Sequence, residues 1–157
     1  MEYTMAQSSL GATYCTLAGL KNPTENCEKA IQAYQESLKV FTLKNFPRDY
    51  AGIQSNLGKI YCTLAEVKNK AENCKKAIQA YQETLKVYTI RDFPWDYALT
   101  QNNLGITYRT LAGVENKAEN CEKAIQAYQE LLKFYTKEES PELYRKIETI
   151  IKRLKEL

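Results

Sequence analysis

The sequence contains no histidine among its 157 residues. Catalysis by a Cys–His pair or a Ser–His–Asp triad within this chain is therefore excluded, as is any metal site with histidine ligands. No run approaches the ~18 consecutive apolar residues that a membrane-spanning helix needs. The first residues, MEYTMAQSSLG, lack the basic start and apolar centre of a secretory signal. We therefore expect a cytoplasmic protein with reduced cysteines.

An excess of charge of either sign is also lacking. The chain has 22 Lys and Arg against 19 Asp and Glu, a net charge of +3 that is spread along its length. Nucleic-acid-binding proteins usually concentrate far more cations on one face, so we expect neither a nucleic-acid nor a membrane partner. The hydrophobic share of 44% and the charged share of 26% are those of an ordinary globular protein. The length predicts one domain over residues 1–157.

What the sequence has instead is an internal repeat with a period of 47 residues. LeuGly occurs at 10–11, 57–58 and 104–105, and AlaIleGlnAlaTyrGlnGlu begins at 30, 77 and 124. The aligned repeats 4–50, 51–97 and 98–144 are identical at 24 of 47 positions. This agreement excludes chance and indicates either duplication or deliberate consensus engineering.

Each repeat is predicted to form two helices. In the second half of the first repeat, apolar residues recur at steps of three and four, which is a helical stripe: Cys27, Ala30, Ile31, Tyr34, Leu38 and Phe41. The first half has the same spacing in Leu10, Tyr14 and Leu17. Prolines 47, 94 and 141 lie between the helix pairs. We expect helices over 4–19, 23–44, 48–66, 70–91, 95–113 and 117–138.

The start of each second helix carries the signature of a capping box. Asn22 is expected at the N-cap, with Pro23 at the first helical position and Glu25 at the third. The same spacing recurs in Asn69 with Glu72 and in Asn116 with Glu119.

The last segment departs from the repeat. A helix start at Ser140-Pro141-Glu142 is followed by an apolar stripe of Tyr144, Ile147, Ile150, Ile151 and Leu154. The other faces of this segment are charged. One apolar side and one polar side predict a helix over 141–157 that caps the end of the array.

The residues Leu10-Gly11-x-x-Tyr14, followed by Ala30, Tyr34 and Ser37, resemble the tetratricopeptide repeat, and matching sets recur through 4–144. The resemblance implies an all-α, right-handed helical solenoid of three helix-hairpin repeats plus the C-terminal capping helix. The period of 47 exceeds the family's ~34. Leu131 occupies the third small position, which predicts looser or shifted packing in the last hairpin. The chain also resembles extended repeats of bacterial, notably cyanobacterial, multidomain proteins, which often accompany a CHAT-type protease or a signalling ATPase.

Three residue types could suggest chemistry, and for each we favour packing. Gly11, Gly58 and Gly105 lack a phosphate-loop motif and are interpreted as close approaches between the two helices of a hairpin. Cys27, Cys74 and Cys121 fall on the apolar stripes, and Cys15 and Cys62 are expected on helices too far apart for a disulfide. The regular placement of most of the twelve tyrosines predicts core rings with hydroxyls reaching the surface.

The resemblance implies that the first helices line a concave groove. Its candidate binding residues are amides, a hydroxyl and two cations: Ser55, Asn56, Lys59, Asn102, Asn103 and Arg109. Asparagine amides can bond both backbone groups of an extended peptide, and cations can anchor an acidic group. The alternative is a solvated polar face without a ligand. The family's clamp for acidic tails of heat-shock proteins needs Lys and Asn where this chain has Ser8 and Ala12, so that mode is disfavoured.

These observations predict a non-catalytic protein-interaction scaffold that binds a peptide or helix of a partner, with no cofactor and no metal. Two alternatives remain open at this point. The chain could be a structural module that self-assembles through its uncapped first helix. It could also be a regulatory segment of a larger protein that carries a protease or ATPase domain.

Overall fold

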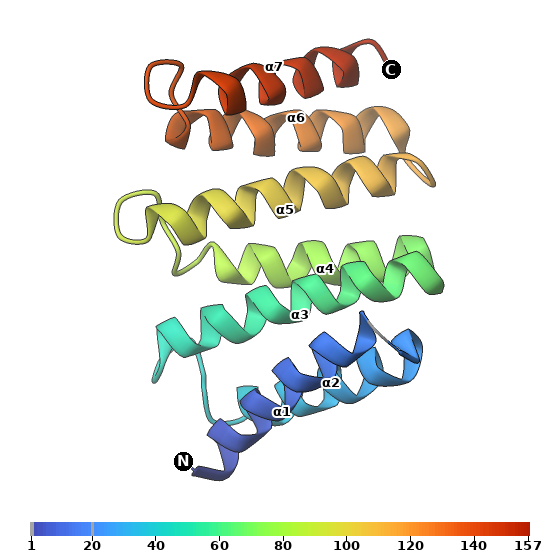
Figure 1. The fold of residues 1–157 in the computed structure, drawn as a ribbon, viewed down its shortest axis with the longest axis vertical. Helices are drawn as coiled ribbons and strands as arrows, with labels where there is room; N and C mark the ends of the chain where they lie inside the picture. Colours follow the sequence, from blue (N-terminus) through green and yellow to red (C-terminus); the bar gives the residue numbers. More distant parts are fainter. Residues whose placement is uncertain (1, 20) are drawn as a thin grey trace. The chain divides into compact units, whose positions relative to one another are not determined.

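The computed structural model describes residues 2–19 and 21–157, with side chains from Met5 onward, and over these residues it contains seven α-helices and no strand (Figure 1). The helices are α1 (Glu2–Ala18), α2 (Pro23–Leu38), α3 (Pro47–Val67), α4 (Lys70–Thr84), α5 (Pro94–Ala112), α6 (Lys117–Phe134) and α7 (Pro141–Lys155). The predicted fold class is confirmed: the chain is all-α and built of helical hairpins.

The chain divides into two compact units, each with its own core. The first unit, Met1–Val87, contains α1 to α4, and the second unit, Tyr88–Leu157, contains α5 to α7. Consecutive helices pack together within each unit. The expectation of a single domain over residues 1–157 stays a prediction.

The second helices end earlier than predicted: α2 ends at Leu38 rather than near 44, and α4 and α6 also stop short. Each of these helices is followed by a turn at a threonine that occurs in all three repeats. Its hydroxyl accepts a hydrogen bond from the backbone N–H three residues later, as Thr42 does from Asn45 at 3.2 Å and Thr89 from Asp92 at 3.1 Å. A hydroxyl that bonds the local backbone in this way favours a turn over a continuing helix.

The predicted capping boxes are wrong, although the asparagines do stand at the N-caps. Asn22, Asn69 and Asn116 have φ of 46°, 47° and 44°, the left-handed region, and none makes a side-chain cap hydrogen bond. Asparagine tolerates this conformation better than other residues with a Cβ. A second asparagine, four residues later, supplies the side-chain bond instead: the Asn73 amide donates to the Lys68 carbonyl at 2.9 Å.

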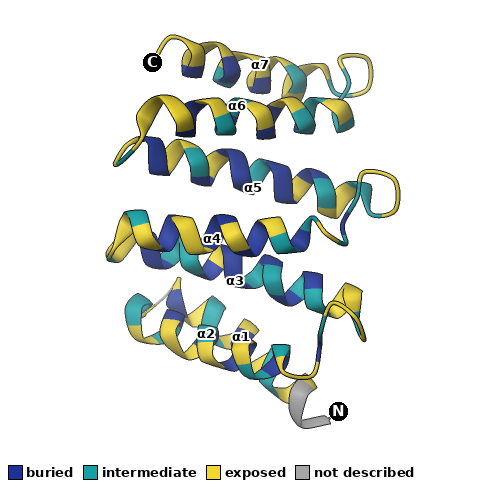
Figure 2. Cartoon of the chain, turned by 180° about the vertical axis from the view of Figure 1, so that it is seen from behind, coloured by how far each residue is buried: buried dark blue, intermediate teal, exposed yellow. Residues whose placement is uncertain are grey.

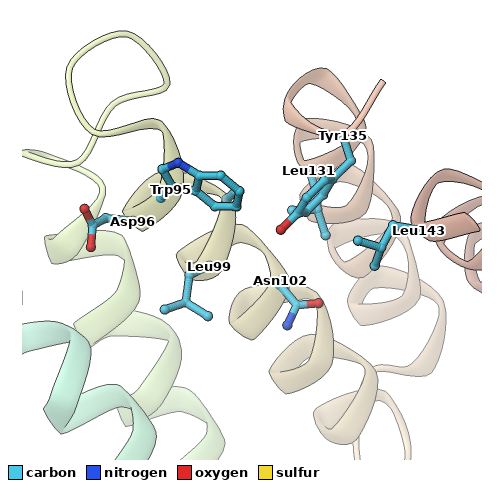
Figure 3. Close-up of a pocket in the computed structure, with 8 residues that line it drawn as sticks. Trp95, Asp96, Leu99, Asn102, Leu131, Tyr135 and Leu143 are labelled. Atoms are coloured by element: carbon cyan, nitrogen blue, oxygen red, sulfur yellow. The ribbon is translucent and has the colours of Figure 1, made fainter. Parts of the chain in front are cut away.

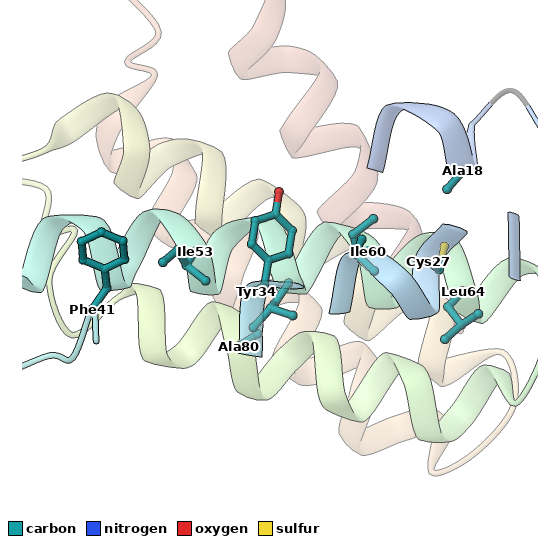
Figure 4. Close-up of a cluster of buried hydrophobic side chains, with 10 residues drawn as sticks. Ala18, Cys27, Tyr34, Phe41, Ile53, Ile60, Leu64 and Ala80 are labelled. Atoms are coloured by element: carbon teal, nitrogen blue, oxygen red, sulfur yellow. The ribbon is translucent and has the colours of Figure 1, made fainter. Parts of the chain in front are cut away.

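The core of the first unit forms where α3 meets α2. Ile53, Leu57, Ile60 and Leu64 recur along α3 and are each at most 5% exposed. With residues of α1, α2 and α4 they form one buried cluster (Figure 4). The T-shaped pair of Phe41 and Phe46, with ring centroids 5.4 Å apart, flanks this core at the turn between α2 and α3.

In the second unit, α7 repeats the register of a first helix. Its Ile147, Ile151 and Leu154 stand 94 residues, or two periods, after Ile53, Leu57 and Ile60, and all three are buried. Figure 2 shows α7 buried along one side and exposed on the other. Where the repeats have a glycine, α7 has Lys152. The predicted capping role of this helix is therefore consistent with its packing on α6.

Candidate functional site

The geometry of each hairpin is set by one glycine and one tyrosine. A Cβ added at Gly11 would fall 2.8 Å from the ring of Tyr34, and one at Gly105 would fall 2.7 Å from the ring of Tyr128. Gly58 lies closer still to the ring of Tyr81. The three rings are 1% exposed, so the interpretation of these glycines as close approaches is confirmed. Each tyrosine ring therefore packs directly against the backbone of the first helix of its hairpin, at the glycine.

The three tyrosine hydroxyls have different surroundings. The Asn56 side chain of α3 hydrogen-bonds with the hydroxyl of Tyr34, although burial still raises the pKa of Tyr34 to about 12. The hydroxyl of Tyr81 lies 3.9 Å from the thiol sulfur of Cys62. The hydroxyl of Tyr128 is buried and has no hydrogen-bond partner among the described residues. The expectation that these hydroxyls reach the surface is therefore wrong for Tyr128.

The register of α7 explains the unpaired hydroxyl. Position 150, two periods after Asn56, is Ile150, which packs against the core of the second unit and offers no polar atom. Burial raises the pKa of Tyr128, and the positive charge of Arg109 acts in the opposite direction. The charge of Arg109 therefore acts on the buried hydroxyl of Tyr128. No amide of the described residues bonds this hydroxyl, because Ile150 stands where the first unit has Asn56.

In the first unit, the candidate residues Ser55, Asn56 and Lys59 lie on α3. Ser55 is 9% exposed and counts as buried. Asn56 is half-buried and already bonded to Tyr34. Lys59 is exposed, and its charge acts on the thiol of Cys15. Of these three residues, Lys59 is available to a ligand, whereas the amide of Asn56 is already bonded to Tyr34.

In the second unit, Asn102, Asn103 and Arg109 lie on α5. Both asparagines are half-buried and Arg109 is exposed. Neither asparagine side chain forms a hydrogen bond with the described residues, and Arg109 forms no ion pair with them. These three residues therefore keep their full capacity to bind a ligand.

A cavity of about 390 Å³ opens between α5, α6 and α7 of the second unit. Its lining is mostly apolar and includes one predicted site residue: Trp95, Asp96, Ala98, Leu99, Asn102, Leu131, Tyr135 and Leu143. Figure 3 shows Trp95, Leu99 and Asn102 on α5 and Leu143 on α7 around this space. Trp95 is 69% exposed and Leu99 is 48% exposed.

Sequence reasoning missed this cavity, although a signal was present. The predictions relied on the helix pattern that the repeats share. The cavity, in contrast, is lined by residues that differ between repeats. Trp95 and Leu99 correspond to Arg48 and Gly52 of the previous repeat. Leu131, which was expected to disturb the last hairpin, borders the cavity, but looser packing there stays a prediction.

The other candidate chemistries find little support. Cys27, Cys74 and Cys121 are buried as predicted, and all five cysteines are free thiols. Among the described residues, no group of three or more Cys, Asp or Glu side chains is placed to hold a metal ion. None of the helices in residues 2–19 and 21–157 combines the length and apolar character that crossing a membrane requires.

Two helices per repeat, a glycine under a buried aromatic ring and a closing amphipathic helix define a helical-hairpin repeat protein. Residues 98–142 match the family model of the tetratricopeptide repeat, in agreement with the resemblance noted from the sequence. The period of 47 residues is a detail that this match leaves untested. No curated protein matches the chain in sequence. Tetratricopeptide repeats generally mediate protein–protein interactions and are typically non-catalytic.

Proposed function

We propose that this protein is a non-catalytic scaffold that binds a peptide segment of a partner protein on the exposed faces of its first helices. The observation that carries the proposal is the unused binding capacity of α5. Two half-buried amides, Asn102 and Asn103, and one exposed cation, Arg109, lie on a helix of a protein-interaction repeat without partners among the described residues. Such amides can bond both the N–H and the C=O of an extended peptide backbone.

The contribution of the first unit is smaller. Asn56 supports Tyr34, so its replacement affects folding as well as any ligand. Lys59 is exposed and available to an acidic group. The binding residues that we propose are therefore Asn102, Asn103 and Arg109, with Lys59 as a separate electrostatic contact.

A displayed library of random peptides, selected on the full chain, tests this proposal. Asn103→Ala is expected to weaken binding of the selected peptides by about 2- to 13-fold, which corresponds to one neutral hydrogen bond of ~0.5–1.5 kcal/mol. Arg109→Ala is expected to weaken binding and also to reduce its salt dependence. Lys39→Ala is the matched control, because Lys39 lies just after α2 and pairs with Glu36. A library that yields no binder, or binders unaffected by all the α5 variants, would overturn the proposal.

A second candidate function is self-assembly, and it rests on the exposed side of α1. Leu10 and Leu17 are 41% and 40% exposed, whereas their equivalents Leu57 and Leu64 in α3 are 5% and 4% exposed because α2 covers them. A second copy that covered α1 would bury these leucines. Sedimentation velocity over a range of concentrations tests this, with Leu10→Asp expected to abolish any association. A chain that stays monomeric at high concentration would exclude it.

A further inference from the structure

The positions at which the second unit differs from the other repeats gather around one cavity. Large apolar residues replace polar or small ones at four lining positions: Trp95 for Arg48, Leu99 for Gly52, Leu131 for Ser37 and Thr84, and Leu143 for Asp49 and Asp96. All four residues line the same cavity of about 390 Å³. Three of them, Trp95, Leu99 and Leu143, are 44–69% exposed. A cluster of exposed apolar groups around a hollow marks a binding site.

The turn that borders the cavity lacks the phenylalanine of the two earlier turns. At the two earlier turns, a phenylalanine packs on the aromatic residue five positions before it: Phe46 on Phe41 at 5.4 Å and Phe93 on Tyr88 at 5.2 Å between ring centroids. At the turn before α7 the equivalent residue is Ser140, and Tyr135 packs instead on its neighbour Phe134, with ring centroids 4.8 Å apart. Tyr135 lines the cavity.

A second anchoring point lies further along the same face of α5. Leu99, Asn102, Ile106 and Arg109 recur at steps of three and four and share one stripe of the helix. At the end of this stripe, Arg109 has no ion pair with a described residue, and the hydroxyl of Tyr128 close to it is a buried donor without an acceptor. A carboxylate is the ligand that satisfies both groups, because it pairs with guanidinium and accepts from a hydroxyl. Arg109 is exposed, so its guanidinium is accessible to a carboxylate from outside the chain.

We propose that the second unit binds an extended segment in which one large apolar side chain enters the Trp95–Leu99–Leu143 cavity and one carboxylate binds Arg109 and the Tyr128 hydroxyl. This inference rests on the proposed function and names the class of partner. Leu99 and Arg109 are ten residues apart in α5, or ~15 Å along the helix axis. An extended peptide advances ~3.3 Å per residue, so the apolar and acidic groups are expected four or five residues apart.

The only tryptophan of the chain, Trp95, is a built-in reporter for this site. The probes are blocked decapeptides with one Phe and one Asp, one to nine residues apart, in a Ser-rich background. We expect a saturable blue shift of Trp95 emission that is strongest at a separation of four or five. A second series ends in a free C-terminal carboxylate in place of Asp, which distinguishes a chain terminus from an acidic side chain. Equal binding at all separations, or by peptides with Lys in place of Asp, would overturn the inference.

Variants of the full chain separate the two anchors. Arg109→Ala is expected to weaken the best peptide about tenfold or more, since a charged hydrogen-bonded pair is lost. Tyr128→Phe keeps the ring on Gly105 but removes the hydroxyl, and is expected to weaken acidic peptides only. Tyr34→Phe is the matched control, because it makes the same change in the first unit. Leu99→Ala is expected to reduce both the affinity and the blue shift.

The outcomes also distinguish this inference from the proposed function. If selected library peptides bind and depend on Asn103, but Trp95 emission and Leu99→Ala have no effect, the proposed function stands and this inference fails. If Tyr34→Phe weakens acidic peptides as much as Tyr128→Phe does, the Tyr128 hydroxyl is not a specific anchor and the proposed carboxylate site is wrong.

Discussion

The backbone of Gly58 in α3 lies against the ring of Tyr81 in α4, so that a Cβ at position 58 would fall 2.7 Å from Cδ1 of Tyr81. The ring is 1% exposed and packed within the first unit, so it cannot swing aside. This contact fixes how closely α3 and α4 approach, and its equivalents fix the other two hairpins.

Gly58→Ala is therefore expected to destabilise the protein by roughly 1–3 kcal/mol, the usual range for an overpacked core. The higher helix propensity of alanine, ~1 kcal/mol, acts in the opposite direction and reduces the net loss. Urea unfolding measures the difference. Gly19→Ala is the control, because the nearest atom to its added Cβ is a backbone oxygen at 3.5 Å, an ordinary contact. A Gly58→Ala protein as stable as the control would show that the ring yields.

Asn69 provides a test of what the asparagine that begins each second helix does. Because its backbone is left-handed and its side chain makes no cap bond, Asn69→Gly is expected to keep or slightly raise stability. Asn69→Ala is expected to cost roughly 1–2 kcal/mol, since alanine is strained in that conformation. Glu72→Ala removes only an exposed pair with Lys76 and is expected to change stability little, because solvent screens the pair. A clear loss with Asn69→Gly would instead support a side-chain cap.

Leucines at equivalent positions are expected to contribute unequally. Leu57→Ala is expected to cost about 2–5 kcal/mol, because Leu57 is 5% exposed between α2 and its own hairpin. Leu10→Ala is expected to cost less than half as much, since Leu10 is 41% exposed. Both free energies come from urea denaturation of the full chain. Equal losses would mean that α1 is covered in solution, which would favour self-assembly.

The sequence predicted the features that repeat and missed those that do not. Apolar spacing and the prolines located all seven helices, and the shared glycines identified the close approaches. The predicted ends of α2, α4 and α6 were wrong. In α2, for example, the apolar spacing continues through Phe41, whereas the backbone leaves the helix after Leu38 and forms a turn in which the Asn45 N–H donates to the Thr42 hydroxyl. The capping boxes were wrong because a spacing does not reveal a left-handed backbone. The cavity is lined by residues that differ between repeats, such as Trp95 for Arg48 and Leu99 for Gly52, and it appears only when α5, α6 and α7 are placed together.

The buried tyrosines predict a loss of stability in alkaline solution. Burial raises the pKa of Tyr34 from 10.0 to about 12, and it raises the pKa values of Tyr81 and Tyr128 in the same direction. Above pH 10 the unfolded chain releases protons that the folded protein retains, so the folded state binds more protons and its stability falls with rising pH. For Tyr34 the loss begins near pH 10 and is complete above about pH 12.

Tyr81→Phe isolates one of these groups. Its ring remains on Gly58, and only the hydroxyl beside Cys62 is removed. The free energies of unfolding from urea denaturation at pH 9, 10 and 11 are expected to fall less steeply for this variant, by up to ~1.4 kcal/mol per pH unit once the unfolded tyrosine is ionised. Burial also raises the pKa values of Cys15 and Cys27, but these thiols are present in both proteins and cancel in the comparison. Parallel curves for the two proteins would contradict a raised pKa at Tyr81.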